Sequence, residues 1–298
     1  MAGGLTSPQA VKDLLHRYGV TPRKGWGQNF LVDRRVLELI LDTAGPDPGD
    51  LVLEIGPGIG TLTRALADKA GRVVALEVDP RLVAVLGETL AGLENVQVIH
   101  ADALEVDLQE LARSYLRDNP GAGCRLVANL PYSITSPLLI KLVKTRVPFR
   151  QAVVTVQREV GERIAALPGR KEYGFLSLIL QYYTRPELIA VVPPAAFYPP
   201  PKVESSIVRL RRLPAPAVDA EEELLFSIAR AAFGKRRKTL GNALEGLHGL
   251  DKEAVKDILT RAGIDPALRG ETLGLEEFGR IAREWALVVD RGGKITYN

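Results

Sequence analysis

From residue 51 onward, segments with the apolar pattern of a strand alternate with segments that have the pattern of a helix. Five short runs have the β-rich composition typical of strands, and they occupy residues 51–55, 72–78, 96–100, 124–129 and 152–157. Between the first two runs, Leu62, Ala65, Leu66 and Ala70 recur at helical spacing, with polar residues on the opposite face. Strands that alternate with helices predict an α/β domain built on a mainly parallel sheet.

The pattern changes in the second half of the chain. Two further apolar runs, at 187–192 and 205–213, are separated by a stretch that is too long for a tight hairpin and too rich in proline for a helix. We expect this stretch to be an ordered functional loop. After the segment LPAPAVDAEEE the pattern is helical. The sequence therefore predicts a Rossmann-like α/β domain over residues 1–214 and a small C-terminal helical domain over residues 215–298.

The first strand run leads into a glycine-rich turn, which a helix follows. Gly56, Gly58 and Gly60 lie where open α/β sheets bind nucleotide-like ligands. The spacing differs from the dinucleotide fingerprint, because Thr61 occupies the place of its third glycine, and the phosphate-loop lysine is absent. A tight turn without a ligand is the alternative. A loop that admits a ligand but lacks a phosphate cradle favours S-adenosylmethionine, which carries an adenosine and no phosphate.

Acidic residues follow the next two strands. Glu77 lies about twenty residues beyond the glycine turn, where a carboxylate can bind both ribose hydroxyls, and Asp79 is a weaker candidate for that contact. Asp102 follows the third strand and can accept a hydrogen bond from an adenine amino group. An aspartate at a strand end is more often a cap or turn residue. Asp102 stands in register with Gly56 and Glu77, because each lies at the carboxyl end of its predicted strand. This shared position favours the contact with the cofactor.

The fourth strand ends in Asn129, Leu130, Pro131 and Tyr132. The asparagine side-chain carbonyl and a backbone carbonyl beside the rigid proline can both accept hydrogen bonds from a target amine, while the tyrosine ring packs against a base. In isolation these residues would be a polar strand end followed by a proline turn. Beside a cofactor site on the same sheet edge, they predict the acceptor site of an enzyme that methylates exocyclic amines.

Composition narrows the class of protein. The 298 residues are 46% hydrophobic and 25% charged, with a formal net charge of +3, as in ordinary globular proteins. No apolar run approaches the roughly 20 residues of a membrane span, so we expect a cytoplasmic protein without membrane contact. Cys124 is the only cysteine and the three histidines are scattered, so we expect no metal site.

Basic residues gather near the predicted sites. A charge run is usually a solvated face, but cations next to a base-modifying site can bind the phosphates of folded RNA. The candidate RNA-binding residues come from three segments and are Arg23, Lys24, Lys202, Lys235, Arg236, Arg237 and Lys238.

Ordered motifs along nearly the whole chain resemble one known family. They are GQNFL, LEIGPGIGTLT, ADAL, NLPYSITSPLL, VQREVGERI, FYPPPKVESSIVRL and FGKRRKTL. Together they resemble the KsgA family of ribosomal RNA adenine dimethyltransferases. Trp26 departs from the family pattern, since another aromatic residue is common there, and Ala101 stands where glycine is common.

The resemblance implies a reaction and its site. It implies transfer of methyl groups from S-adenosylmethionine to the exocyclic amines of two adjacent adenosines in the 3′-terminal hairpin loop of 16S ribosomal RNA, within the small ribosomal subunit and its biogenesis. We expect a monomer. The cofactor-binding residues would be Gln28, Asn29, Leu31, Gly56, Gly58, Glu77, Asp102 and Asn129. The catalytic site would comprise Asn129, Leu130, Pro131, Tyr132 and Phe197. In that site Phe197 stacks on the target adenine opposite Tyr132.

Two other functions stay open. An Erm-type methyltransferase of large-subunit ribosomal RNA shares the fold and the cofactor motifs, although NLPY in place of the NIPY common there, and the FGKRRKTL segment, argue against it. An assembly checkpoint factor would act mainly by binding immature small subunits, with methylation as its release step.

Overall fold

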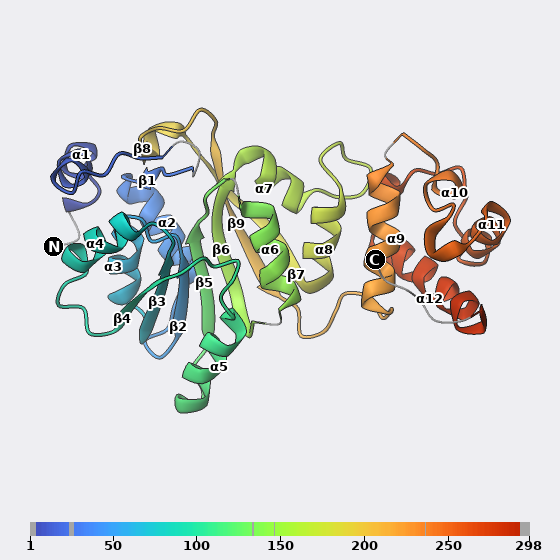
Figure 1. Cartoon of the computed structure of the whole chain (residues 1–298), viewed down its shortest axis with the longest axis horizontal. Coiled ribbons are helices and arrows are strands. Elements are labelled where there is room, and N and C mark those ends of the chain that lie inside the picture. The colour runs from blue at the N-terminus through green and yellow to red at the C-terminus, as the bar shows by residue number, and fades with distance from the viewer. Residues whose placement is uncertain (1–3, 24–26, 133, 146, 236, 293–298) are drawn as a thin grey trace. The chain divides into compact units, whose positions relative to one another are not determined.

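The computed structural model describes residues 4–23, 27–132, 134–145, 147–235 and 237–292 (Figure 1). The chain divides into two compact units, one of residues 1–161 with 185–212, the other of residues 162–184 with 213–298. The second unit thus includes 162–184, which the sequence pattern assigned to the first domain. The reason is aromatic packing inside this unit, where Phe175 and Tyr182 make edge contacts with the Phe226 ring.

The first unit is built on a seven-stranded sheet with the order β4-β3-β2-β5-β6-β9-β7. Its strands are β2 (Leu51–Ile55), β3 (Arg72–Glu77), β4 (Val96–His100), β5 (Cys124–Asn129), β6 (Phe149–Gln157), β7 (Thr184–Val192) and β9 (Ser205–Arg212). Neighbours from β4 to β6 pair in parallel, and β9 pairs antiparallel to β6. All seven predicted strands are present. The chain leaves β2 toward β3 on one side and later returns to β5 on the other, which creates the switch point where such sheets bind ligands.

Helices accompany the strands of this unit (Figure 1). They are α1 (Pro8–Arg17), α2 (Arg34–Ala44), α3 (Thr61–Ala67), α4 (Pro80–Thr89), α5 (Leu108–Asp118) and α6 (Thr135–Lys144), and the first unit ends within α7 (Arg158–Ala165). Aspartate side chains cap the N-termini of three of them, at Asp33, Asp79 and Asp107, and thereby satisfy amides that have no partner within the helix. All five residues of β2 are buried, as expected for a parallel strand covered on both faces.

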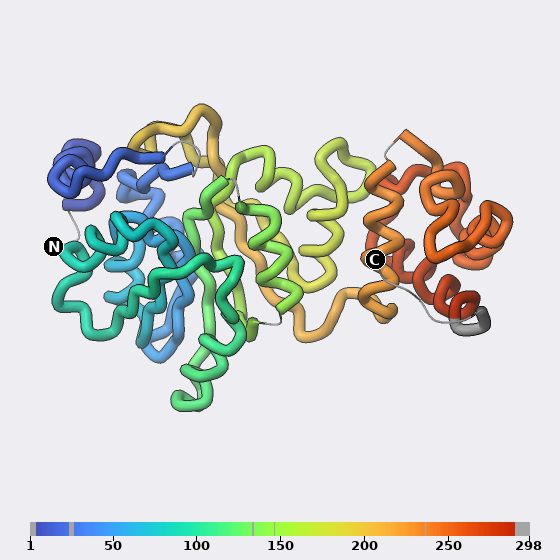
Figure 2. The backbone as a smooth tube through the Cα atoms, viewed as in Figure 1, coloured from blue at the N-terminus to red at the C-terminus, as the bar shows by residue number. Residues whose placement is uncertain are grey.

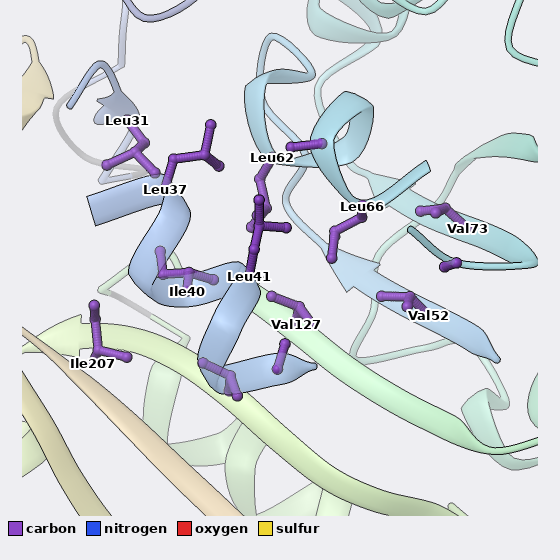
Figure 3. Close-up of a cluster of buried hydrophobic side chains, with 14 of the residues drawn as sticks. Leu31, Leu37, Ile40, Leu41, Val52, Leu62, Leu66, Val73, Val127 and Ile207 are labelled. Carbon is purple, nitrogen blue, oxygen red and sulfur yellow. The ribbon is translucent and has the colours of Figure 1, made fainter. Parts of the chain in front are cut away.

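One hydrophobic cluster joins α2 and α3 to the sheet. Figure 3 shows Leu41 of α2 near Val127 of β5, and Leu66 of α3 near Val52 of β2. The apolar positions of α2 recur at helical spacing and form one face of the helix. Successive side chains of a strand point to opposite faces of the sheet, so alternate strand residues pack against that helix face. This packing holds α2 and α3 against strands β2 and β5, whose carboxyl ends form the edge of the sheet described below.

A short second sheet ties the N-terminal segment to the proline-rich stretch. Strand β1 (Phe30–Leu31) pairs antiparallel with β8 (Phe197–Tyr198), directly after the 3₁₀ turn η3 (Pro194–Ala196). In Figure 2 the blue N-terminal tube runs beside the yellow stretch that contains β8. The predicted ordered loop is therefore a strand partner of the GQNFL segment.

The second unit is built mainly of helices. They are α8 (Phe175–Tyr183), α9 (Glu222–Gly234), α10 (Leu240–Ala243), α11 (Lys252–Arg261) and α12 (Leu275–Gly292), with the 3₁₀ turns η4 (Leu247–Gly249) and η5 (Gly270–Thr272). Phe226, Phe278 and Trp285 are among its fully buried side chains. No helix in the described ranges of the chain has the length and apolar character needed to cross a membrane.

Candidate active site

A pocket lies at the switch point of the sheet, where β2, β3 and β5 end. It holds about 890 Å³ of space, which includes open solvent at its mouth. The segments that line it include residues 27–31, 54–59, 76–78 and 101–103. The structure brings together, along this one lining, every residue that the sequence analysis assigned to the cofactor, namely Gln28, Asn29, Leu31, Gly56, Gly58, Glu77, Asp102 and Asn129.

The glycine turn combines left-handed backbone with close packing. Gly56 and Gly58 have φ angles of 71° and 60°, a region that favours glycine. A Cβ atom on Gly58 would lie 2.9 Å from Cδ1 of Phe30. The N-terminal segment can therefore approach the turn only because position 58 has no side chain.

Glu77 ends β3 inside the pocket lining and is 5% exposed. Its Oε1 accepts a hydrogen bond from the Asp79 amide at 2.9 Å, and its Oε2 accepts one from the Gly58 amide at 3.3 Å. Burial raises the pKa of this carboxyl, while the two backbone donors oppose that shift. The side chain is thus held at the edge of the glycine turn, and its contact with a ribose stays a prediction.

Glu54 is a second buried carboxyl in the lining, and the sequence analysis did not single it out. It is 1% exposed, and its Oε2 has no hydrogen-bond partner among the described residues. Burial, and to a lesser extent the charge of Glu77, raises its pKa to about 8. The signal in the sequence was an acidic residue inside the apolar run LVLEI, a position where an unpaired charge is costly.

The two aspartates near the cofactor end have different surroundings. Asp79, the weaker candidate for the ribose contact, is fully buried and is not part of the pocket lining, because Gln28 and Arg81 occupy its carboxylate. Asp102 lies in the lining, and its Oδ1 accepts a hydrogen bond from the Leu104 amide at 2.8 Å. Asp102 therefore caps its turn and still faces the pocket.

Hydrogen bonds within the protein orient the Asn129 side chain and use the Pro131 carbonyl, which lie where the acceptor site is predicted. Asn129 Nδ2 donates to the Asn29 carbonyl at 2.9 Å, so its Oδ1 is the atom left to accept from a substrate amine. The Pro131 carbonyl already accepts from the Ile134 amide at 3.2 Å and from the Thr135 hydroxyl at 3.1 Å. Both lone pairs of this carbonyl are therefore used within the protein. Leu130 is 1% exposed and does not line the pocket, so the second, backbone acceptor stays a prediction.

The two aromatic residues predicted to hold the target base do not line the pocket. Tyr132 is half-buried, and its hydroxyl is 2.8 Å from Ser205 Oγ; burial raises its pKa. Phe197 is 3% exposed and belongs to the hydrophobic cluster beneath β1 and β8. A base could reach the Phe197 ring only after that side chain left the core, so its stacking role stays a prediction.

The predicted RNA-binding cations are exposed wherever the structure describes them. Arg23 and Lys202 lie on the surface of the first unit, and Lys235, Arg237 and Lys238 on that of the second. The remaining two, Lys24 and Arg236, lie outside the described residues, as does Trp26. Among the described residues, no group of three or more histidine, cysteine or acidic side chains could hold a metal ion.

Curated relatives match almost the full length of the chain. The Ribosomal RNA small subunit methyltransferase A of Pelotomaculum thermopropionicum is 47% identical over 296 residues, which cover 97% of this chain and 99% of that protein. The protein of the same name from Bacillus thuringiensis is 46% identical and covers 95% of this chain and 98% of its own length.

Solved structures share the fold. A dimethyladenosine transferase from Plasmodium falciparum superposes with a TM-score of 0.73 at 25% identity, covering 86% of this chain and 97% of that one. The 23S rRNA methyltransferase ErmE gives a TM-score of 0.65 at 29% identity, with 86% and 99% covered. The family model described as "Ribosomal RNA adenine dimethylase" matches residues 19–285. The chain therefore belongs to the ribosomal RNA adenine dimethylase family.

Proposed function

We propose that this chain dimethylates the exocyclic amines of two adjacent adenosines in the 3′-terminal hairpin loop of 16S ribosomal RNA, with S-adenosylmethionine as methyl donor. The observation that carries the proposal is that one pocket is lined both by Glu77, at the end of β3, and by Asn129, at the end of β5. The names of the relatives at 43–47% identity support the small subunit as the substrate.

The cofactor end of the pocket has the donors and acceptors that an adenosine needs. Glu77 offers its carboxylate to the ribose hydroxyls, and Asp102 offers an acceptor to the adenine amino group. Gly56 and Gly58 allow the close approach. When bound, S-adenosylmethionine supplies a methyl group on a positively charged sulfur, which is the electrophile of the reaction.

At the acceptor end the protein positions the amine. Asn129 Oδ1 and the Leu130 or Pro131 carbonyl would accept hydrogen bonds from its two N–H groups, which favours a tetrahedral nitrogen with a lone pair available for attack. Such alignment is worth roughly 7–11 kcal/mol of barrier. No general base is required, because the nitrogen becomes strongly acidic once it is methylated and its proton passes to water.

Glu77→Ala is expected to weaken S-adenosylmethionine binding by more than about 1.5 kcal/mol, because a charge-assisted contact is lost in a mostly buried site. Isothermal calorimetry measures this directly. Glu38→Ala, which removes an exposed carboxylate paired with Arg34, is the control. A Kd unchanged from the wild type would remove Glu77 from the cofactor site.

Replacement of Lys235, Arg236, Arg237 and Lys238 by Gln is expected to weaken RNA binding roughly tenfold and to flatten its salt dependence, because phosphate contacts release counterions. Cofactor affinity should not change. Lys252→Gln with Lys256→Gln, on exposed positions of α11, controls for loss of charge in the same unit. If RNA binding by the variant depended on salt concentration as steeply as binding by the wild type, the basic run would be only a solvated face.

Mass spectrometry of small-subunit RNA after incubation with the protein and labelled cofactor tests the reaction. Primer extension on both ribosomal RNAs separates it from the Erm-type alternative, in which the modified adenine lies in large-subunit RNA. The checkpoint alternative predicts that the Glu77→Ala protein still binds small subunits and blocks their maturation.

A further inference from the structure

Two consecutive residues of the N-terminal segment hydrogen-bond to opposite ends of the candidate active site. Gln28 Nε2 donates to Asp79 Oδ2, just beyond β3, at 3.0 Å. The Asn29 carbonyl accepts from Asn129 Nδ2, at the end of β5, at 2.9 Å. Strands β3 and β5 flank β2, so the segment spans the glycine turn that follows β2.

The Gln28 amide is held at both of its polar atoms. Its Oε1 accepts a hydrogen bond from the Arg23 amide at 2.8 Å, while its Nε2 donates to Asp79. If the amide were flipped, its NH₂ group would face the Arg23 N–H and its oxygen would face the Asp79 carboxylate. These two partners therefore fix the orientation of the Gln28 amide. Gln28 was predicted to bind the cofactor, yet both of its side-chain polar atoms bind the protein.

Asp79 connects this contact to Glu77. Its carboxylate is fully buried and accepts hydrogen bonds from Arg81 Nε at 2.9 Å and from the Arg81 amide at 3.1 Å. Its own amide donates to Glu77 Oε1. The hydrogen bonds from Arg81 and Gln28 hold the pKa of Asp79 well below its usual range, so the carboxylate stays ionised as an acceptor.

We propose that Gln28 and Asp79 are positioning residues for the cofactor, and that the hydrogen bond between them, called here the latch, holds residues 27–31 against the pocket and keeps the Glu77 carboxylate oriented. This inference rests on the proposed cofactor role of Glu77. Asp79 acts from outside the pocket lining, through its amide, and Gln28 acts through the segment that it anchors. The latch therefore predicts an effect on cofactor affinity from a residue that does not line the pocket.

The test measures the Kd of S-adenosylmethionine and of S-adenosylhomocysteine by calorimetry on the full chain. Gln28→Ala is expected to raise both constants about tenfold while the melting temperature stays near that of the wild type, because the side chain is only half-buried. Gln9→Ala is the matched control, since it removes another amide-to-carboxylate hydrogen bond, to Asp13, between two exposed side chains of α1. It should leave both constants unchanged.

A reciprocal exchange separates the latch from a general packing effect. Gln28→Glu places two carboxylates together and should weaken binding further. Adding Asp79→Asn supplies an amide donor to the new glutamate, and Arg81 Nη2, which donates to the same Asp79 oxygen as Gln28, can pair with the glutamate carboxylate instead. Asparagine still caps the N-terminus of α4. The double variant should therefore bind the cofactor more tightly than Gln28→Glu alone.

The outcomes distinguish the latch from the proposed function. If Gln28→Ala binds like the wild type while Glu77→Ala does not, the latch is overturned and the cofactor site stands. If neither variant changes affinity, both fail. Weakened binding that the double variant does not restore would also overturn the latch.

Discussion

Phe197→Ala is expected to lower the free energy of unfolding by about 3–5 kcal/mol, the usual loss when a buried phenylalanine is truncated. The ring is 3% exposed and lies in the cluster that also contains Leu31 and Ile207. Its backbone pairs with Leu31 across β1 and β8, so a cavity there would loosen the segment that lines the pocket. Urea denaturation of the wild type and the variant measures the loss.

Phe197→Leu is the matched variant, because it keeps most of the buried volume and should cost less than about 1.5 kcal/mol. It removes the ring that would stack on an adenine. If stacking contributes to the reaction, Phe197→Leu should reduce turnover while cofactor affinity stays near that of the wild type. Full specific activity in the folded fraction of both variants would leave Phe197 as a core residue only.

The free energy of unfolding is expected to fall by about 3–5 kcal/mol between pH 5 and pH 9 through Glu54 alone. Burial raises the pKa of this carboxyl from 4.5 to about 8 in the folded protein. Between those two values the folded state keeps a proton that the unfolded chain has released. Stability is therefore fully present below pH 4.5 and is lost as the pH rises through about 8.

Glu54→Gln isolates this contribution, since the amide has nearly the same shape and does not titrate. Urea denaturation at pH 6 and pH 9 should show a smaller loss of stability in the variant than in the wild type. Glu77, whose pKa is also raised, is present in both proteins and its charge acts on Glu54, so the difference between the two losses measures Glu54 together with its coupling to Glu77. Equal losses in the two proteins would mean that the Glu54 carboxyl is not protonated in the folded state.

The local pattern of the chain was sufficient to predict the strands of the sheet and much of the pocket. Strand and helix periods depend on neighbouring residues, so the runs that became β2 to β6 could be identified one at a time. Parallel strands bring their carboxyl ends to one edge. Glu77, Asp102 and Asn129 therefore had to lie near each other once the strand order followed the usual rule.

Only the tertiary structure decided the contacts between segments that are distant in the sequence. The pairing of Phe30 with Tyr198 buries the Phe197 ring, and the contact from Gln28 to Asp79 takes Asp79 out of the pocket lining. The first contact depends on the register of two strands, and the second on competition among several polar partners. The periodic pattern of neighbouring residues encodes neither. The family resemblance identified Phe197 as a candidate, and its place after a strand identified Asp79. Only the packing of these residues determines which partners they can reach.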